Sequence, residues 1–160
     1  MSDKMTHFDE QGNAIMVDVG GKGVSKREAV ASGVVQMQAE TLKRILDADI
    51  EKGDTLNVAR LAGIMAAKKT PDLIPLCHPL SLSAVRIDFH SDTSAGHLEI
   101  RATVSVTGVT GVEMEALTAV AVAALTIYDM CKSIDRSMTL GEIRLLEKRG
   151  GKSGEWRRAE

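Results

Sequence analysis

The sequence predicts an α+β fold in which an antiparallel sheet carries helices on one face. Apolar and polar residues alternate along 29–37, 85–90 and 98–107, which is the period of strands with one buried face. Residues 54–65 and 112–134 instead carry the spacing of helices. The resulting order of strand, helices, two strands, helix and strand is that of a split βαβ unit. We therefore expect a ferredoxin-like sandwich.

The first part of the chain contains one predicted strand and two predicted helices. Small or apolar residues occupy every second position of the strand: Ala29, Ala31, Gly33, Val35 and Met37. A short helix follows, and its apolar side consists of Leu42, Ile45 and Leu46. After a turn at 51–54, Asp54 is a candidate N-cap for the second helix. The predicted buried face of this helix has the spacing i, i+3, i+4 and i+7, at Val58, Leu61, Ala62 and Met65.

The second part contains a predicted hairpin, a long helix and a last strand. Three prolines, Pro71, Pro75 and Pro79, indicate an extended, irregular passage before the hairpin. The hairpin turns near Gly96, and the long helix runs over about 112–134. Its longest uncharged run, 116–128, is shorter than the roughly 20 residues of a membrane span. We expect a buried helix, no membrane-spanning segment, and a final strand at about 138–146.

Composition narrows the classes of function. The chain has 160 residues, a formal net charge of −2 and 44% hydrophobic residues, which suits one globular domain. A net charge near zero and a shortage of aromatic residues argue against nucleic-acid binding. Two cysteines far apart in the sequence indicate a reduced environment without disulfides. The first residues contain no apolar segment typical of a secretion signal, so we expect a cytoplasmic protein.

Charged residues mark both ends of the long apolar helix. Glu113 and Glu115 lie near its start, and Asp129 and Lys132 lie near its end. Glu115 and Asp129 share one face to within about 40°, but about 21 Å of helix separates them. Two copies packed antiparallel about a two-fold axis would bring the two ends together, which predicts a site at a subunit interface. The alternative is that these charges only cap the helix and compensate its dipole.

Two other segments suggest binding chemistry. Cys77 and His78 are adjacent, but the spacing of zinc ligands is missing around them. The pair is either a buried cysteine with a histidine hydrogen-bonded in a tight turn, or a site where His78 binds an anion. The glycine-rich segment 150–154 is no Walker A motif, because Leu146 stands where that motif needs glycine. Its Lys152 could still close over a phosphate. Further cations lie in or beside turns and element ends, at Lys22, Lys26, Arg27, Lys52, Lys68 and Lys148.

Several long segments resemble one known family, in the same order along the chain. They are Asp72–Leu80, Thr110–Ala119, Leu125–Lys132 and Gly150–Gly154, together with Met16–Val19 and Lys52–Asp54. The chain closely resembles the MoaC family of molybdenum cofactor biosynthesis over nearly its whole length. The resemblance implies a ferredoxin-like fold, in agreement with the patterning.

The resemblance also implies an activity. Members of the family convert 3′,8-cyclo-7,8-dihydroguanosine 5′-triphosphate, which a radical S-adenosylmethionine enzyme supplies, into cyclic pyranopterin monophosphate and diphosphate. They are phosphorus–oxygen lyases that assemble as homohexamers, trimers of dimers, with the active site at the dimer interface. Acid–base chemistry suffices for such a rearrangement, so we expect no cofactor, although Mg²⁺ could accompany the triphosphate. We expect 13–154 to form a single catalytic domain between a mobile N-terminus (1–12) and a mobile tail (155–160).

The expected site residues follow from the matching positions. The resemblance implies that Asp129 is the active-site acid and that Lys52 and Lys132 are catalytic lysines. It places Leu76, Cys77, His78, Met114 and Glu115 in contact with substrate, with Glu113 beside them. Arg27 and Lys152 are expected to contact the triphosphate or the glycine-rich loop. No residue is expected to bind a metal ion.

Three other functions are compatible with parts of the pattern. A silent nucleotide-binding module would use the same cations, but it would not need Lys52, Asp129 and Lys132 together. A structural protein would use these polar residues only to line an oligomer interface, so that alanine at Asp129 would weaken assembly rather than chemistry. A nucleic-acid binder would show salt-dependent retention on DNA or RNA, which the charge argues against.

Overall fold

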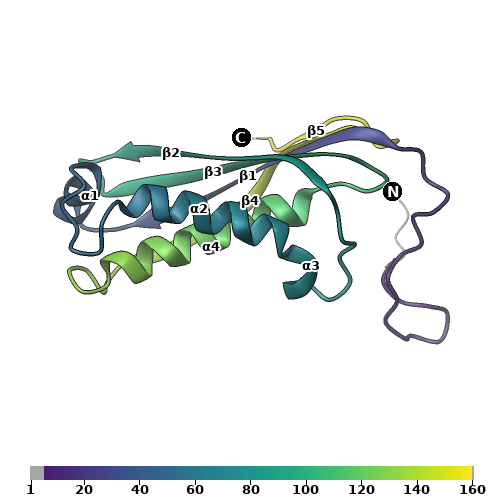
Figure 1. The fold of residues 1–160 in the computed structure, drawn as a ribbon, viewed down its shortest axis with the longest axis horizontal. Helices are drawn as coiled ribbons and strands as arrows, with labels where there is room; N and C mark the ends of the chain where they lie inside the picture. The colour runs from purple at the N-terminus through teal and green to yellow at the C-terminus, as the bar shows by residue number, and fades with distance from the viewer. Residues whose placement is uncertain (1–5, 160) are drawn as a thin grey trace.

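A five-stranded antiparallel sheet, with strand order β2-β3-β1-β4-β5, runs the length of the molecule (Figure 1). The computed structural model describes residues 6–159. The elements are β1 (Ser25–Gln36), α1 (Ala39–Leu46), α2 (Thr55–Lys68), α3 (Thr70–Leu73), β2 (Leu82–Asp92), β3 (His97–Gly108), α4 (Glu113–Cys131), β4 (Thr139–Arg149) and β5 (Trp156–Arg157). Helices α2 and α4 lie side by side on one face of the sheet (Figure 1). The predicted ferredoxin-like α+β sandwich is confirmed.

The central strands β1 and β3 supply the sheet side of the core. Every second residue of β3 from Leu98 to Val106 is buried, as the alternation predicts. β1 pairs with β3 in unbroken register from Ser25 to Gln36, and it pairs with β4 through two bulges. Gly33 in β1 permits close contact with α4, because a Cβ there would lie 2.6 Å from Cγ1 of Val120. The predicted hairpin of β2 and β3 is also confirmed.

Helix α4 is the centre of the core. It packs against β1, β3, β4 and α2, and its residues Ala116, Ala119, Val120, Ala123 and Ile127 are fully buried. By length and composition α4 could cross a membrane, but half of its most apolar window is covered by the rest of the chain. That environment is typical of a core helix, as the sequence predicts. The helix ends at Cys131, one turn earlier than expected.

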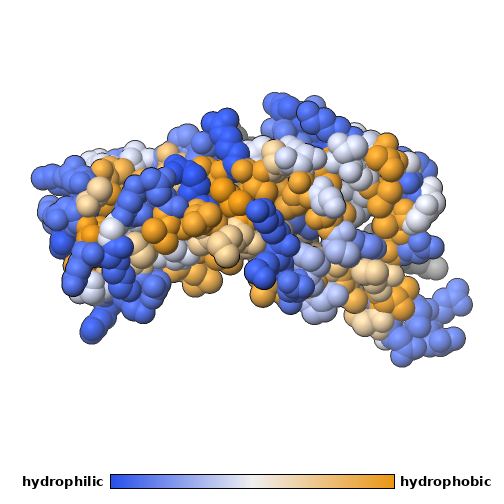
Figure 2. Space-filling model, in the orientation of Figure 1, coloured by the Kyte–Doolittle hydropathy of each residue, from blue (hydrophilic) through white to orange (hydrophobic). Residues whose placement is uncertain are grey.

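The buried face of α2 differs from the predicted one. Asp54 caps the helix as expected, by accepting a hydrogen bond from the backbone N of Asn57. However, Val58, Leu61 and Met65 are exposed, and apolar surface is visible over α2 in Figure 2. The face that packs on the sheet and on α4 consists of small residues: Ala59, Gly63, Ala66 and Ala67.

The reason for this difference is the short distance between α2 and its neighbours. A Cβ on Gly63 would lie 2.2 Å from Cδ1 of Ile87 and 3.0 Å from the carbonyl oxygen of Ala119. Large side chains do not fit between elements this close, so the small-residue face turns inward. The larger apolar side chains remain on the surface, where a contiguous exposed apolar area usually marks an interaction site.

Two further segments differ from the prediction. The irregular passage with three prolines contains a helical turn, α3, because Pro71 fits the first turn of a helix. The predicted tail 155–160 contributes β5, which pairs with β4, so the sheet extends beyond residue 154. Residues 1–5 of the predicted mobile N-terminus and residue 160 lie outside the described residues. The mobility of both ends stays a prediction.

Candidate active site

A pocket of about 310 Å³ lies beside the start of α4. Six of the predicted site residues line it: Leu76, Cys77, His78, Glu113, Met114 and Glu115. The loop before β2 and the first turn of α4 therefore meet at one place. The N-terminal segment completes the wall with Val17 and Val19. His78 holds this segment in place by donating through Nε2 to the carbonyl oxygen of Val17 at 2.6 Å.

Glu115 is the buried acid of this pocket. Its residue surface is 3% exposed. Burial raises the pKa of Glu115 above its ordinary value, and the negative charge of Glu113 raises it further. Burial and the neighbouring Glu115 carboxyl also raise the pKa of the Cys77 thiol. A carboxyl with a raised pKa keeps its proton to a higher pH than an exposed glutamate does, so Glu115 is a candidate proton donor.

A second pocket of about 640 Å³ adjoins the first, and Thr110, Gly111, Glu113 and Lys22 line both. Its cations come from two stretches of the chain, around β1 and around the end of β4: Lys22, Arg27, Lys148 and Lys152. Lys148 Nζ contacts Glu113 Oε1 at 2.5 Å, and Arg27 Nε donates to the carbonyl oxygen of Gly108 at 3.1 Å. One acid and four cations leave an excess of positive charge, which suits an anionic ligand.

The glycine-rich loop between β4 and β5 packs directly on Arg27. Gly150 and Gly151 have φ values of +92° and +73°, a region that L-residues with side chains rarely adopt. A Cβ on Gly150 would lie 2.2 Å from the carbonyl oxygen of Lys26, and one on Gly151 would lie 2.1 Å from Arg27 Nη1. Two glycines therefore let the loop approach β1 and carry Lys152 to the pocket.

A separate charged cluster lies at the far end of α4. Lys132 Nζ lies 2.7 Å from Asp129 Oδ1, and Lys52 Nζ lies 3.6 Å from Asp129 Oδ2. Lys52 also donates to the backbone carbonyl oxygen of Asp129 at 2.9 Å. The hydrogen bond and charge of Lys132, with the charge of Lys52, lower the pKa of Asp129, and Asp129 in turn raises the pKa of Lys132. The three predicted catalytic residues therefore form one ionised group.

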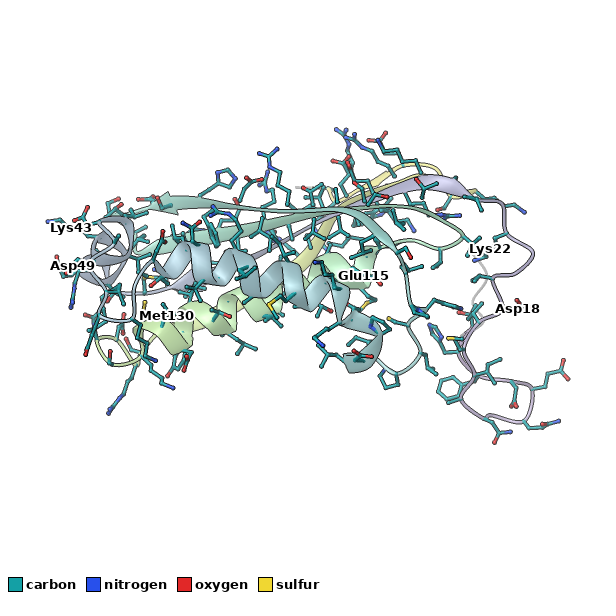
Figure 3. The ribbon with its side chains drawn as sticks, viewed as in Figure 1. Asp18, Lys22, Lys43, Asp49, Glu115 and Met130 are labelled. Carbon is teal, nitrogen blue, oxygen red and sulfur yellow. The ribbon has the colours of Figure 1, made fainter. Side chains whose placement is uncertain are left out.

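The predicted site residues thus fall into two groups at opposite ends of one helix. Figure 3 labels Glu115 and Met130 towards the two ends of α4. The 14 residues from Glu115 to Asp129 correspond to about 21 Å of helix. Within one chain, the Asp129 cluster does not reach the pockets around Glu115 and Arg27.

Comparison with known proteins identifies the family. A sequence profile of the MoaC family matches residues 16–151, which include every predicted site residue except Lys152. The chain belongs to the MoaC family.

Relatives of nearly the same length support this assignment. A protein of Heliobacterium modesticaldum named cyclic pyranopterin monophosphate synthase is 61% identical, over 99% of each chain. A protein of Chloroflexus aurantiacus with the same name is 60% identical, over 97% of this chain and 95% of its own. A third, from Parvibaculum lavamentivorans, is 59% identical over 96% of each chain.

The geometry of this MoaC-family chain adds two residues to the expected site. Lys22 lies between the two pockets, and Lys148 contacts Glu113 across the larger one. The sequence singles out both only as cations near element ends, among several others. Lys22 and Lys148 join the expected site because the N-terminal segment and β4 lie beside Arg27 in the folded chain. Spacing along the sequence does not reveal this arrangement.

Within residues 6–159, the structure contains no group of three or more His, Cys, Asp or Glu residues placed to hold a metal ion. Cys77, His78 and Glu115 line the smaller pocket without forming such a group. That the reaction needs no metal or other cofactor stays a prediction.

Proposed function

We propose that this chain converts 3′,8-cyclo-7,8-dihydroguanosine 5′-triphosphate into cyclic pyranopterin monophosphate and diphosphate, as a step of molybdenum cofactor biosynthesis. The observation that carries the proposal is its identity of about 60%, over nearly full length, with proteins named cyclic pyranopterin monophosphate synthase. The acids and lysines expected from the family stand in two clusters suited to proton transfer and anion binding.

The larger pocket is proposed to bind the triphosphate. Arg27 and Lys152, with Lys22 and Lys148, would neutralise its charge. Formation of the cyclic phosphate expels diphosphate, and cations that are already in place stabilise the negative charge developing on that leaving group. Glu113 holds Lys148 beside the pocket through their ion pair. A Mg²⁺ ion carried by the triphosphate is compatible with this arrangement but is not required by it.

The smaller pocket is proposed to bind the guanine-derived ring. Leu76 and Met114 offer apolar contacts, while Cys77, His78 and Glu115 offer polar ones. The rearrangement opens and recloses rings without a net change of redox state, so it needs proton donors and acceptors rather than an oxidant. Glu115 is proposed to donate a proton. Asp129, Lys52 and Lys132 are proposed to exchange protons at a second position on the substrate.

A complete site is proposed to require two copies of the chain. An antiparallel pairing about a two-fold axis would bring Asp129 of one copy to the Glu115 pocket of the other. The exposed apolar face of α2 and the exposed Leu125 of α4 offer surface to bury in an assembly. Three such dimers would make the homohexamer that is typical of the family. We further propose that the protein acts in the cytoplasm on substrate supplied by a radical S-adenosylmethionine enzyme.

Turnover by the purified chain tests the proposed function. The substrate, prepared enzymatically, is incubated with the protein, and released diphosphate and cyclic pyranopterin monophosphate are measured together. We expect stoichiometric release of both from the wild-type chain and at least a roughly hundredfold lower rate from Lys52→Ala. Lys43→Ala is the matched control, because Lys43 is an exposed lysine on the neighbouring α1.

Two outcomes would contradict parts of the proposal. Binding of the triphosphate without release of diphosphate would indicate a silent nucleotide-binding module instead. Normal turnover by Lys52→Ala would remove Lys52 from the catalytic group while leaving the activity itself established.

A further inference from the structure

Asp135 is a buried carboxylate in the connection between α4 and β4 (132–138), and it is 3% exposed. Its Oδ2 accepts hydrogen bonds from the backbone N of Gln38 at 3.0 Å and from Thr41 Oγ1 at 3.1 Å. Its Oδ1 accepts from the backbone N of Ser137 at 3.1 Å and from Ser137 Oγ at 2.7 Å. Burial alone would raise the pKa of Asp135, because it disfavours the charged carboxylate. The hydrogen bonds outweigh this effect and hold the pKa below its ordinary value.

Oδ2 of Asp135 is hydrogen-bonded to the start of α1, whereas Oδ1 is hydrogen-bonded to Ser137 in the same loop as Asp135. Gln38 and Thr41 lie at the start of α1, where the N-cap residue Gln38 makes no side-chain cap of its own. Asp135 therefore caps α1 from a distance, which satisfies a backbone N–H that the helix leaves free. The hydrogen bonds from Ser137 remain within the connection that carries Asp135. Only the Oδ2 side therefore fixes α1 relative to α4.

The segments that Asp135 joins are those that carry the two lysines of the Asp129 cluster. Lys52 lies in the connection that follows α1 (47–54). This connection folds back on α1, because the backbone N of Asp49 donates to the carbonyl oxygen of Arg44 at 2.8 Å. Lys132 directly follows α4. A shift of α1 relative to α4 would therefore move Lys52 away from Asp129.

The lysine contacts themselves hold this arrangement only weakly. The side chains of Lys52, Lys132 and Asp129 are 45%, 52% and 60% exposed, and exposed ion pairs contribute little to stability. A buried carboxylate resists rearrangement more strongly, because each hydrogen bond it loses leaves an unsatisfied buried group. A second buried contact, between Thr55 Oγ1 and Cys131 Sγ at 3.8 Å, joins the start of α2 to the end of α4.

We propose that Asp135 is a positioning residue that sets the distance between Lys52 and the Asp129–Lys132 pair through its hydrogen bonds to α1. Its effect on turnover rests on the proposed function, whereas its effect on Lys52 does not. Asp135 acts through the backbone and makes no contact with the substrate. Its loss therefore lowers the rate of the chemical step rather than the affinity for the triphosphate, because Lys52 is not among the cations proposed to bind the triphosphate.

Two single substitutions separate positioning from general stability. Thr41→Val removes one hydroxyl donor on the α1 side of Asp135, and Ser137→Ala removes one on the loop side, where the hydrogen bond is shorter. We expect Thr41→Val to lower kcat by about tenfold with KM changed by less than about twofold, because small misplacements of catalytic groups are costly. Ser137→Ala should leave both constants near the wild-type values. Ile100→Val, in the buried part of β3, serves as a control for loss of stability alone.

Chemical labelling of Lys52 provides a readout that needs no substrate. The rate of Lys52 acetylation by acetic anhydride is measured by peptide mass spectrometry in the full-length protein, with exposed Lys43 as internal reference. We expect the ratio of Lys52 to Lys43 labelling to rise several-fold in Thr41→Val and in Asp135→Asn, and to stay unchanged in Ser137→Ala and Ile100→Val. Asp135→Asn keeps the shape of the side chain, and far-ultraviolet circular dichroism checks that the variant is folded.

The outcomes of the two measurements are distinguishable. If the wild-type chain does not turn over the cyclic nucleotide, the proposed function fails, and selective labelling of Lys52 in Thr41→Val would still support the positioning role. If Thr41→Val and Ser137→Ala lose activity equally, or in proportion to their loss of melting temperature, the positioning role is wrong. Unchanged labelling of Lys52 in Thr41→Val and Asp135→Asn would also overturn it.

Discussion

Gly151 lies against the guanidinium group of Arg27 so closely that a Cβ at position 151 would be 2.1 Å from Arg27 Nη1. The glycine-rich loop therefore packs directly against the end of β1 that carries Arg27. The arrangement also explains how Lys152, 125 residues after Arg27 in the chain, comes to line the same pocket.

Gly151→Ala should weaken triphosphate binding more than it weakens the fold. The new methyl group would displace Arg27, and the φ of +73° is unfavourable for alanine by about 1 kcal/mol or more. We expect KM to rise by about tenfold, which corresponds to the loss of one charge-assisted contact, with a smaller change in kcat. Gly12→Ala is a matched control, because Gly12 also has a positive φ but has open space around its Cβ position. An unchanged KM would show that Arg27 does not contact the triphosphate.

Glu115→Gln should separate the contribution of Glu115 to stability from its contribution to catalysis. Burial raises the pKa of Glu115 in the folded state. At pH values between its ordinary pKa and this raised pKa, Glu115 is therefore more protonated in the folded chain than in the unfolded chain. The wild-type free energy of unfolding should therefore fall as pH rises through that window. Glutamine cannot ionise, so the variant should lose this pH dependence. Its stability should therefore increase relative to that of the wild type as pH rises. Turnover should be lost. Thermal melts at about every half pH unit between pH 4 and pH 8 test this relation. Parallel curves for both proteins would contradict it.

Mixing two inactive variants should restore activity if each site draws on two chains. Glu115→Gln and Asp129→Asn are each expected to be inactive. In a dimer containing one of each, one site carries both substitutions and the other carries neither. After dissociation and reassembly of equal amounts, about a quarter of the wild-type activity is expected, because half of the dimers are mixed and each has one intact site. Recovery near zero, with mixed dimers confirmed by mass spectrometry, would place the complete site within one chain.

Leu61→Glu tests the role of the apolar face of α2. Leu61 is 59% exposed, so a charge there should leave the isolated fold intact. If this face is buried in the assembly, the charge should be strongly unfavourable, and both the oligomer and the turnover should be lost. Light scattering measures the mass, and far-ultraviolet circular dichroism confirms the fold. Glu51→Gln, an exposed substitution in the turn before α2, is the control. An oligomer of unchanged mass and activity would show that this face stays exposed.

Patterning along the chain is enough to locate most elements. The alternation in 98–107 depends only on which side of a strand is buried, and this is decided locally by the sequence of apolar and polar residues. The N-cap at Asp54 is also local, because its hydrogen bond joins residues three apart. The buried face of α2 is different. The larger apolar residues of that helix predict one face, and the close approach of Ile87 and Ala119 to Gly63 selects another.

The candidate site divides in the same way. The resemblance to the MoaC family, carried by motifs in the sequence, predicts Lys52, Asp129 and Lys132 as site residues, and helix geometry is sufficient to place Glu115 about 21 Å from Asp129. Only the folded chain brings Arg27, Lys148 and Lys152 to one pocket, since they come from β1, from β4 and from the loop that follows β4. Only burial gives Glu115 its raised pKa, because desolvation depends on every segment that covers the side chain. The anchoring of α1 by Asp135 likewise depends on contacts across 94 and 97 residues, which no local pattern predicts.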